Sequence, residues 1–295
     1  MQHPPPGEGG PGMPLHNISN RQELVSFLKN KCVDIRKMIV QLTVTAGGGH
    51  VGGALSMTEM LVVLYQHILN IDPSNPKKPD RDRLILSKGH GGVGICPVLC
   101  DAGYFPKSEM DGFNQFLSPF GMHPDMNKVK GIDMSTGSLG HGLSICVGLG
   151  LAARLDKATW RAFCVLGDGE CNEGSVWEAA MSAKHYKLGN VIALVDKNKF
   201  MIDGPVEQIM SIEPFEEKWK AFGWKTTVID GHSIEQLLDT LENLDPPDSQ
   251  TPQCIICNTV KGRGVSFMEG QGKWHYGGLD ELLEKQALED IEKTR

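Results

Sequence analysis

The stretch 161–204 constrains the fold of this chain most, because two apolar runs in it flank a segment of helix-forming composition. The runs 162–166 and 191–195 predict buried strands, and 173–187 predicts a helix between them. A strand, a helix and a second strand in this order predict a parallel pair joined by a right-handed crossover. We therefore expect an α/β fold built on a parallel sheet.

Two polar residues follow these strands. Asp168 lies between Gly167 and Gly169 after the first strand, and Asn198 lies just beyond the second. Because parallel strands end at the edge of the sheet where open α/β folds bind ligands, we expect the two side chains to be neighbours. Carboxylate, amide and carbonyl oxygens suit Mg²⁺ or Ca²⁺ and leave positions for phosphate oxygens. The alternative is a tight turn that contains Asp168 without a ligand, and Asn198 after the second strand makes it the weaker hypothesis.

The remaining segments continue the alternation of helices and strands, so we interpret residues 16–295 as one domain. The expected strands are 83–87, 225–229 and 253–259. The first expected helix begins at Ser19 or Asn20, and the second begins at a capping box of Ser56 and Glu59. Further helices are expected over the segments 143–153, 215–222, 233–244 and 279–293. Residues 1–15, rich in proline and glycine, predict a flexible tail without the apolar core of a signal peptide.

Charge and cysteine content limit the partners and the compartment. The formal net charge of −7 argues against nucleic acid or an anionic membrane as a partner, since either would favour a basic face. No apolar run approaches the roughly 20 residues that a transmembrane helix needs. Eight cysteines without a secretory signal predict free thiols in a reducing compartment, so we expect a cytoplasmic protein. Cys254 and Cys257 should face opposite sides of one strand as core residues rather than form a redox or zinc pair.

Four histidines lie in glycine-rich or loop contexts: His50, His90, His123 and His275. Neutral imidazole offers one donor and one acceptor and titrates near neutrality, so it can bind hydroxyls or phosphate and move protons. Each histidine alone is more often structural, but together they form a candidate site. We interpret His67 as structural because it lies on an apolar helix, and His185 and His232 because their surroundings suggest no other role.

Seven segments of the chain resemble the N-terminal half of a transketolase. They are GGGHVGGALSMTE, LILSKGHG, FGMHP, STGSLGHGL, LGDGECNEGSVWEA, VDKNKFMIDG and TVKGRGVSFMEGQGKWH. Their common order and spacing are far more specific than any one of them, and the resemblance covers nearly all of residues 20–290. It implies a doubly wound, mainly parallel α/β sheet with helices on both faces, the fold of the diphosphate-binding domain of thiamine diphosphate enzymes.

The resemblance also implies roles for single residues. The metal ligands would be Asp168, Asn198 and the backbone carbonyl of Phe200, with Mg²⁺ as the expected ion and Ca²⁺ or Mn²⁺ as alternatives. The contacts to thiamine diphosphate would come from His90, Gly137, Ser138, Leu139, Gly169, Asn198 and His275. His50, His123 and His275 would be catalytic residues that line the donor-sugar channel, and Glu173 and Glu178 would lie at a subunit interface. His141 stands where many members have Gln and Ser138 where some have Pro, which leaves the fine positioning of the cofactor open.

The activity that the resemblance implies is transfer of a two-carbon ketol unit from a ketose phosphate to an aldose phosphate through thiamine diphosphate. One alternative is a transketolase for a modified ketose such as a sulfo-ketose, and another is the α subunit of a 2-oxo acid dehydrogenase. The four histidines suit a polyhydroxylated sugar better than a 2-oxo acid. A nucleotide-binding α/β protein without catalysis is the alternative from another class, and it predicts no need for thiamine diphosphate.

We also expect the chain to act with a second polypeptide. In transketolases the glutamate that activates the aminopyrimidine of the cofactor lies in the pyrimidine-binding domain, which follows the diphosphate-binding domain. This chain ends at Arg295, about halfway through the length of the family. The expected partner is therefore a C-terminal transketolase subunit with that domain. We expect an α2β2 heterotetramer in which each active site lies between unlike subunits.

Overall fold

The computed structural model describes residues 18–295, and the predicted tail 1–15 lies outside them. Five strands form one sheet in the order β1-β2-β3-β5-β4, and each of the four pairings is parallel. The strands are β1 (Arg83–Leu86), β2 (Ala162–Gly167), β3 (Val191–Lys197), β4 (Lys225–Asp230) and β5 (Gln253–Asn258). Ala162 of β2 lies opposite Val191 of β3, which confirms the parallel pair that was predicted for 161–204.

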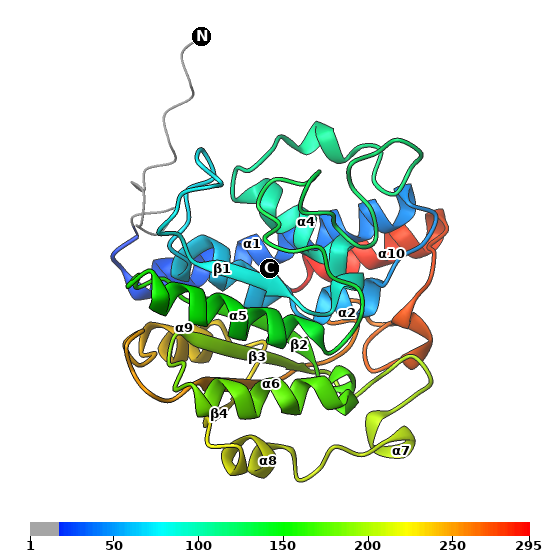
Figure 1. Cartoon of the computed structure of the whole chain (residues 1–295). Coiled ribbons are helices and arrows are strands. Elements are labelled where there is room, and N and C mark those ends of the chain that lie inside the picture. The colour runs from blue at the N-terminus through cyan, green and yellow to red at the C-terminus, as the bar shows by residue number, and fades with distance from the viewer. Residues whose placement is uncertain (1–17) are drawn as a thin grey trace.

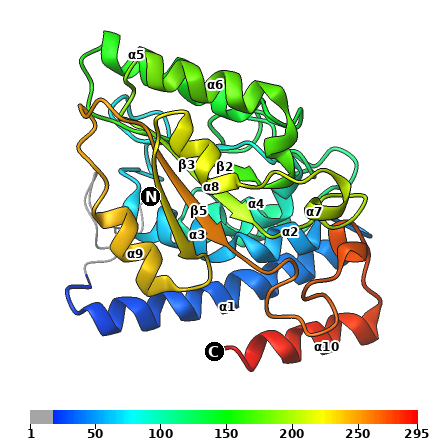
Figure 2. The same ribbon diagram turned by 90° about the horizontal axis from the view of Figure 1, so that it is seen from below.

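Helices cover both faces of the sheet, as expected (Figure 1). One face packs against α1 (Arg21–Thr45), α2 (Val51–Ser56), α3 (Thr58–Val63), α4 (Gly92–Asp101), α9 (Ile234–Glu242) and α10 (Glu281–Glu292), and the other against α5 (His141–Leu155), α6 (Gly174–His185) and α8 (Phe215–Ala221). Figure 2 shows the sheet between α1, on one side, and α5 and α6, on the other. Successive residues of a strand enter opposite cores. Cys254 and Cys257 accordingly belong to different cores, as predicted.

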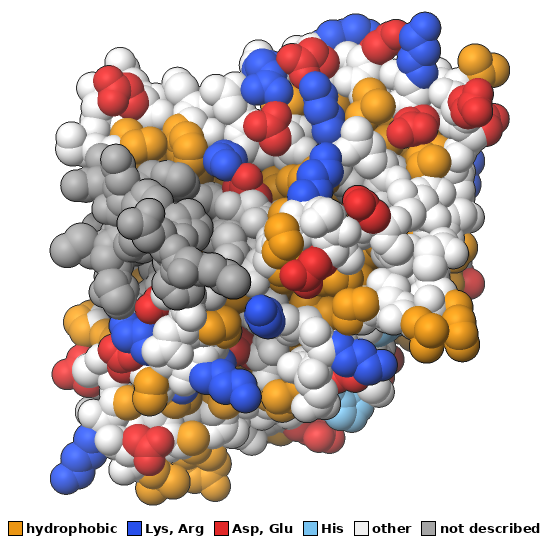
Figure 3. Space-filling model, turned by 90° about the horizontal axis from the view of Figure 1, so that it is seen from above, with side chains coloured by type: hydrophobic (Ala, Val, Ile, Leu, Met, Phe, Trp, Pro, Cys, Tyr) orange, Lys and Arg blue, Asp and Glu red, His pale blue; other side chains and the backbone are white. Residues whose placement is uncertain are grey.

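Short helical turns complete the described part of the chain. They are a π-helical turn (Leu64–Ile68), α7 (Val206–Ile209) and 3₁₀ turns at Gly89–Gly91, Lys107–Met110, Gly169–Asn172 and Gly272–His275. No helix among residues 18–295 combines the length and the apolarity needed to cross a membrane. Acidic, basic and apolar side chains are interspersed over the face shown in Figure 3.

The start of the first helix is as predicted, whereas that of the second is not. Asn20 caps α1, because its side chain accepts hydrogen bonds from the N–H groups of Gln22 at 2.9 Å and Glu23 at 3.1 Å. Ser56 was predicted to open the next helix through a capping box with Glu59. Ser56 instead ends α2, and its buried hydroxyl donates a hydrogen bond to Asp196 at 2.6 Å. The prediction was wrong because a contact with a distant residue took the place of the local cap.

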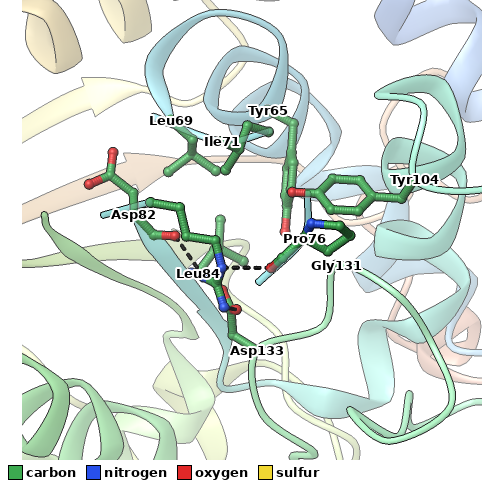
Figure 4. Close-up of a pocket in the computed structure, with 10 residues that line it drawn as sticks. Tyr65, Leu69, Ile71, Pro76, Asp82, Leu84, Tyr104, Gly131 and Asp133 are labelled. Atoms are coloured by element: carbon green, nitrogen blue, oxygen red, sulfur yellow. Dashed lines mark hydrogen bonds and ion pairs between the residues drawn. The ribbon is translucent and has the colours of Figure 1, made fainter. Parts of the chain in front are cut away.

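A polar cluster anchors the beginning of β1 (Figure 4). Asp133 accepts a hydrogen bond from the Leu84 N–H at 2.8 Å and pairs with the Arg81 guanidinium. Asp82 accepts hydrogen bonds from the N–H groups of Asn70 at 2.9 Å and Arg161 at 2.7 Å. The cavity among these residues has a volume of about 10 Å³, room for one water molecule. Its carboxylates are engaged in holding the strand, so the cluster is structural.

Candidate active site

The carboxyl ends of several strands meet around one buried carboxylate. Asp196, in β3, accepts hydrogen bonds from Ser56 Oγ at 2.6 Å and Asn198 Nδ2 at 3.0 Å. It also binds the ammonium group of Lys88, which follows β1, and the hydroxyl of Thr259, which follows β5. Burial alone would raise the pKa of Asp196, but Lys88 and these hydrogen bonds hold it below its usual range. Asp196 therefore ties β1, β3, β5 and α2 together beside the predicted site.

Asp168 is buried at the end of β2 and lies next to the Asn198 segment, as expected. Its Oδ2 accepts a hydrogen bond from the Lys199 N–H at 2.7 Å, and its Oδ1 accepts one from the Gly169 N–H at 2.9 Å. Burial and the negative charge of Asp196 raise the pKa of Asp168 to about 6. A divalent cation would offset both effects, so the carboxylate suits a metal ligand.

The Asn198 amide is oriented for the same role. Its Nδ2 donates to Asp196 at 3.0 Å, so its Oδ1 is the atom that faces the Phe200 N–H, at 3.1 Å. With the Asp168 carboxylate and the Phe200 carbonyl, Asn198 Oδ1 would give an oxygen-only donor set of the kind that Mg²⁺, Ca²⁺ and Mn²⁺ prefer. Within residues 18–295 no three His, Cys, Asp or Glu side chains form a metal cluster. A metal here would therefore depend on neutral oxygens beside one carboxylate.

The four predicted histidines converge, although they come from four separate segments. The ring centre of His50 lies 4.8 Å from that of His90, 5.4 Å from that of His275 and 6.4 Å from that of His123. The rings of His90 and His275 are 5.6 Å apart. The Nδ1 atom of His50 is buried and has no hydrogen-bond partner. Such an atom is costly unless a ligand satisfies it, which indicates a binding site.

Backbone contacts hold these segments together. Gly49, which precedes His50, and Gly277, which lies two residues after His275, exchange two N–H···O hydrogen bonds of 3.0 Å. A Cβ atom at Gly52 would lie 2.6 Å from the Trp274 carbonyl oxygen, so α2 can approach the His275 turn only with glycine at this position. The glycines that surround His50 in the sequence therefore bring it close to His275.

Burial keeps the histidines of the cluster neutral near pH 7. Burial is the main cause that lowers the pKa of His50 to about 4, of His90 to about 2 and of His275 to about 3, and the charges of Lys88 and Lys261 lower all three further. Burial also lowers the pKa of His123. Each neutral ring has one donor and one acceptor nitrogen. The cluster can therefore bind hydroxyl groups and accept a proton from one of them.

Two buried lysines belong to the site and were missed in the sequence. Lys88 Nζ binds Asp196 and donates to the Gly53 carbonyl oxygen at 3.1 Å. Lys261 Nζ lies 3.0 Å from His275 Nδ1, and burial and the charge of Lys88 lower the pKa of Lys261 to about 8. Both lysines come shortly after a strand in the sequence, as Asp168 and Asn198 do, and this placement is the signal that could have identified them.

The segment 137–139 lies between the histidines and the Asp168 turn. A Cβ atom at Gly137 would lie 3.1 Å from His123 Cδ2. At its other end, the N–H of Gly140 donates to Glu170 Oε1 at 2.9 Å, while Glu170 Oε2 accepts from the Gly167 N–H at 2.9 Å. Gly140 has a φ of 83°, a conformation that favours glycine. Glu170, which was not predicted, thus joins Gly140, the residue after Ser138 and Leu139, to Gly167 at the end of β2.

The two predicted interface residues lie outside the histidine cluster. Glu173 precedes the first residue of α6 and Glu178 lies within it, and both side chains are exposed. His141, the first residue of α5, is also exposed, and its Nδ1 lies 3.1 Å from the Leu139 carbonyl oxygen. These residues are therefore available to contact a second chain.

Comparison with known proteins shows the family of the chain as a whole. Residues 28–289 match the family model of the transketolase thiamine diphosphate binding domain. The chain is 42% identical over 266 residues to the 6-deoxy-6-sulfo-D-fructose transketolase subunit of Clostridium sp. (strain MSTE9), covering 90% of this chain and 96% of the relative. It is 40% identical over 256 residues to one of the subunits of the apulose-4-phosphate transketolase of Phocaeicola vulgatus, covering 87% of this chain and 90% of the relative.

Longer transketolases match over part of their length. The chain is 34% identical to the transketolase of Homo sapiens over 92% of this chain but 43% of the relative. The crystal structure of transketolase from Campylobacter jejuni superposes with a TM-score of 0.85 at 29% identity, over 91% of this chain and 43% of that one. These matches favour transketolase over a 2-oxo acid dehydrogenase. This chain belongs to the transketolase family and corresponds to its thiamine diphosphate binding domain.

Proposed function

We propose that the chain is the N-terminal subunit of a two-chain transketolase, which transfers a two-carbon ketol unit from a ketose to an aldose. The observation that carries the proposal is the cluster of neutral histidines, with an unpartnered His50 Nδ1, next to the oxygen donors after β2 and β3. Thiamine diphosphate supplies the carbanion chemistry when it is bound. Titration calorimetry with the cofactor and Mg²⁺ separates this proposal from a nucleotide-binding protein without catalysis, which would show no binding.

The chain offers distinct groups to the parts of the cofactor. We propose that Asp168, Asn198 Oδ1 and the Phe200 carbonyl would hold the Mg²⁺ ion, whose charge would favour binding of the diphosphate. Gly169 follows Asp168 and begins the 3₁₀ turn Gly169–Asn172. An added Cβ atom at Gly169 would lie 3.1 Å from Met201 Cβ, so the backbone there is closely packed. The further cofactor contacts would come from His90, His275 and the segment Gly137, Ser138 and Leu139.

His50, His123 and His275 would act on the sugar. A neutral ring whose pKa is lowered by burial can accept a hydroxyl hydrogen bond without carrying a charge. His50 has a free Nδ1 atom for this purpose. We propose that these histidines orient the hydroxyl groups of the donor and take up the proton that is released when its carbon–carbon bond breaks.

We predict a division of labour among the histidines. His50→Ala and His123→Ala should each lower kcat/KM by about 10²–10⁴, because they remove groups that bind and deprotonate sugar hydroxyls. Cofactor affinity should remain nearly unchanged in both. His90→Ala should instead weaken cofactor binding. The measurements are steady-state kinetics of the complex and titration calorimetry, with exposed His185→Ala as the control. Weaker cofactor binding in His50→Ala, with an unchanged kcat/KM at saturating cofactor, would contradict the assignment.

The charge of Lys261 predicts a pH dependence. Its pKa of about 8 means that the ammonium is present at pH 7 and largely lost at pH 9. If only the charged form attracts the anion, the affinity for inorganic pyrophosphate with Mg²⁺ should fall about tenfold over this range. Lys261→Met should show only the titration of pyrophosphate itself and serves as the reference. Parallel pH profiles for the two proteins would show that Lys261 does not bind the anion.

The donor sugar is proposed from the relatives. The two subunits with 42% and 40% identity are named for a sulfo-fructose and for apulose 4-phosphate, whereas the transketolase of Homo sapiens is 34% identical. We propose a ketose with a terminal anion, a phosphate or a sulfonate, on an ordinary or modified carbon skeleton. An activity screen of donor ketoses with the partner chain present tests this choice.

The proposed assembly is an α2β2 heterotetramer with a C-terminal subunit that carries the pyrimidine-binding domain. Two relatives of nearly the same length as this chain are named as subunits. On α5, the small residues Ser144 and Gly148 and the apolar Leu155 are exposed. Glu178 of the neighbouring α6 and Glu173, which precedes it, are exposed as well, so a second chain can pack closely on this surface. The eight cysteines are free thiols, in keeping with the proposed cytoplasmic location.

A further inference from the structure

A chain of buried polar groups links the first helix to the site from outside the histidine cluster. The Arg36 guanidinium, in α1, binds both carboxylate oxygens of Glu59, in α3, at 2.6 and 2.7 Å. Glu59 Oε2 lies 3.1 Å from His232 Nδ1, in the loop after β4. The three side chains are 4%, 7% and 8% exposed. Burial alone would raise the pKa of Glu59. The charge of Arg36 and the hydrogen bond with His232 instead lower it to about 2, so the carboxylate is charged in the interior.

The two partners of His232 define which of its ring nitrogens carries the proton. Its Nε2 lies 2.8 Å from the backbone nitrogen of Val260, which can only donate. Nε2 must therefore carry the lone pair, and the proton of the neutral ring is on Nδ1, where it is donated to Glu59. A carboxylate that binds one ring nitrogen fixes the orientation of the imidazole, and the other nitrogen can then hold its own partner in place. Histidines that bind metals are oriented by a carboxylate in the same way.

The group that His232 holds belongs to the active-site loop. β5 ends at Asn258, so the Val260 N–H lies beyond the last strand pairing, and it donates to a side chain instead. The neighbouring N–H groups donate to backbone oxygens: Thr259 to Lys197 at 3.2 Å and Gly262 to Gly52 at 3.0 Å. Lys261 follows Val260 directly and directs its ammonium group to His275.

We infer that His232 is a positioning residue: the Glu59–His232 pair fixes the backbone at Val260 and thereby places the Lys261 ammonium in the site. The inference rests on the proposed function, in which the charge of Lys261 attracts the diphosphate. A different interpretation is that His232 serves only to satisfy the buried Glu59. The two interpretations differ in which ring nitrogen of His232 matters, so they can be separated by substitutions that mimic one nitrogen at a time.

The test compares His232→Gln with His232→Asn. The Gln amide reaches the place of Nε2 and can accept from the Val260 N–H, whereas the Asn amide reaches the place of Nδ1 and can donate to Glu59. The first measurement is hydrogen exchange of the Val260 amide in the unliganded chain. The second is the affinity for thiamine diphosphate with Mg²⁺, measured by calorimetry in the chain with its partner.

We expect His232→Gln to keep the Val260 amide protected and to bind the cofactor with wild-type affinity. His232→Asn should expose the amide and weaken binding about three- to tenfold, the effect of one lost hydrogen bond. The inference would be overturned if both variants lost amide protection and cofactor affinity to the same extent. It would also be overturned if His232→Asn retained the amide protection and the cofactor affinity of the wild type. If the wild-type complex bound no cofactor, the proposed function would fail, whereas the exchange experiment would still decide whether His232 holds Val260.

A measurement on the wild-type chain covers the case in which a variant does not fold. The ¹⁵N chemical shifts of the His232 ring report which nitrogen carries the proton. We expect the proton on Nδ1 and a lone pair on Nε2. A proton on Nε2 would be incompatible with acceptance from Val260 and would exclude the proposed role.

Discussion

Asp168→Ala is expected to abolish Mg²⁺-dependent binding of thiamine diphosphate. Asp168 is the one charged residue among the proposed ligands, and the other two, Asn198 Oδ1 and the Phe200 carbonyl, are neutral. Loss of a group that merely supports a metal ligand typically costs 10–100-fold in affinity, so loss of the charged ligand itself should cost on the order of 100-fold or more. Titration calorimetry with the cofactor at fixed Mg²⁺ measures this loss.

The matched control is Asp203→Ala, which removes an exposed acidic residue from the segment that follows Phe200. It should bind the cofactor like the wild type, because its carboxylate is not among the proposed ligands. Circular dichroism and thermal unfolding without metal establish that both variants are folded. Wild-type cofactor affinity in folded Asp168→Ala would refute the metal assignment.

The second large effect concerns the partner chain. We expect the purified chain to show no measurable ketol transfer alone and to become active when a separately expressed pyrimidine-domain subunit is added. This chain supplies the proposed metal ligands and the sugar-binding histidines, whereas the resemblance to transketolases puts the carboxylate that activates the aminopyrimidine in the other domain. Since one acid–base group contributes about 10²–10⁴ in rate, its absence should lower turnover by at least about 10².

The reconstitution is measured by adding increasing amounts of the second polypeptide at constant concentration of this chain. Activity should rise in proportion to the complex formed and level off at equal numbers of the two chains. His50→Ala in the same titration should form the complex but restore at most about a hundredth of the wild-type activity, which separates assembly from catalysis. Rapid turnover by this chain with every other polypeptide excluded by mass spectrometry would rule out the two-chain proposal.

The local pattern of the sequence predicted the sheet well. The apolar runs before Asp168 and before Asn198 are β2 and β3, and their parallel pairing places the two polar residues side by side. This success has a physical reason, since strand and helix composition are local properties and parallel strands necessarily end at a common edge. The positions of Asp168 and Asn198 after two parallel strands were therefore enough to predict that the two side chains lie close together.

The capping box at Ser56 shows where local reasoning failed. The sequence pattern was suitable for a cap, but the Ser56 hydroxyl is used by Asp196, 140 residues away in the chain. His232 was interpreted as structural for a similar reason, because its partners Glu59 and Val260 are distant in sequence. A single residue does not reveal a partner that only the folded chain brings near.

The sequence by itself determined the order of strands and helices, the polar residues at the strand ends and the glycines around the histidines. These follow from periodicity, from turn chemistry and from the steric freedom of glycine. Only the tertiary structure decided how closely the four histidines approach one another, that Lys261 joins them, and that Glu59 and His232 lie behind Val260. These contacts depend on how α2, β4 and β5 pack together, and packing brings side chains within hydrogen-bond distance irrespective of their separation along the chain.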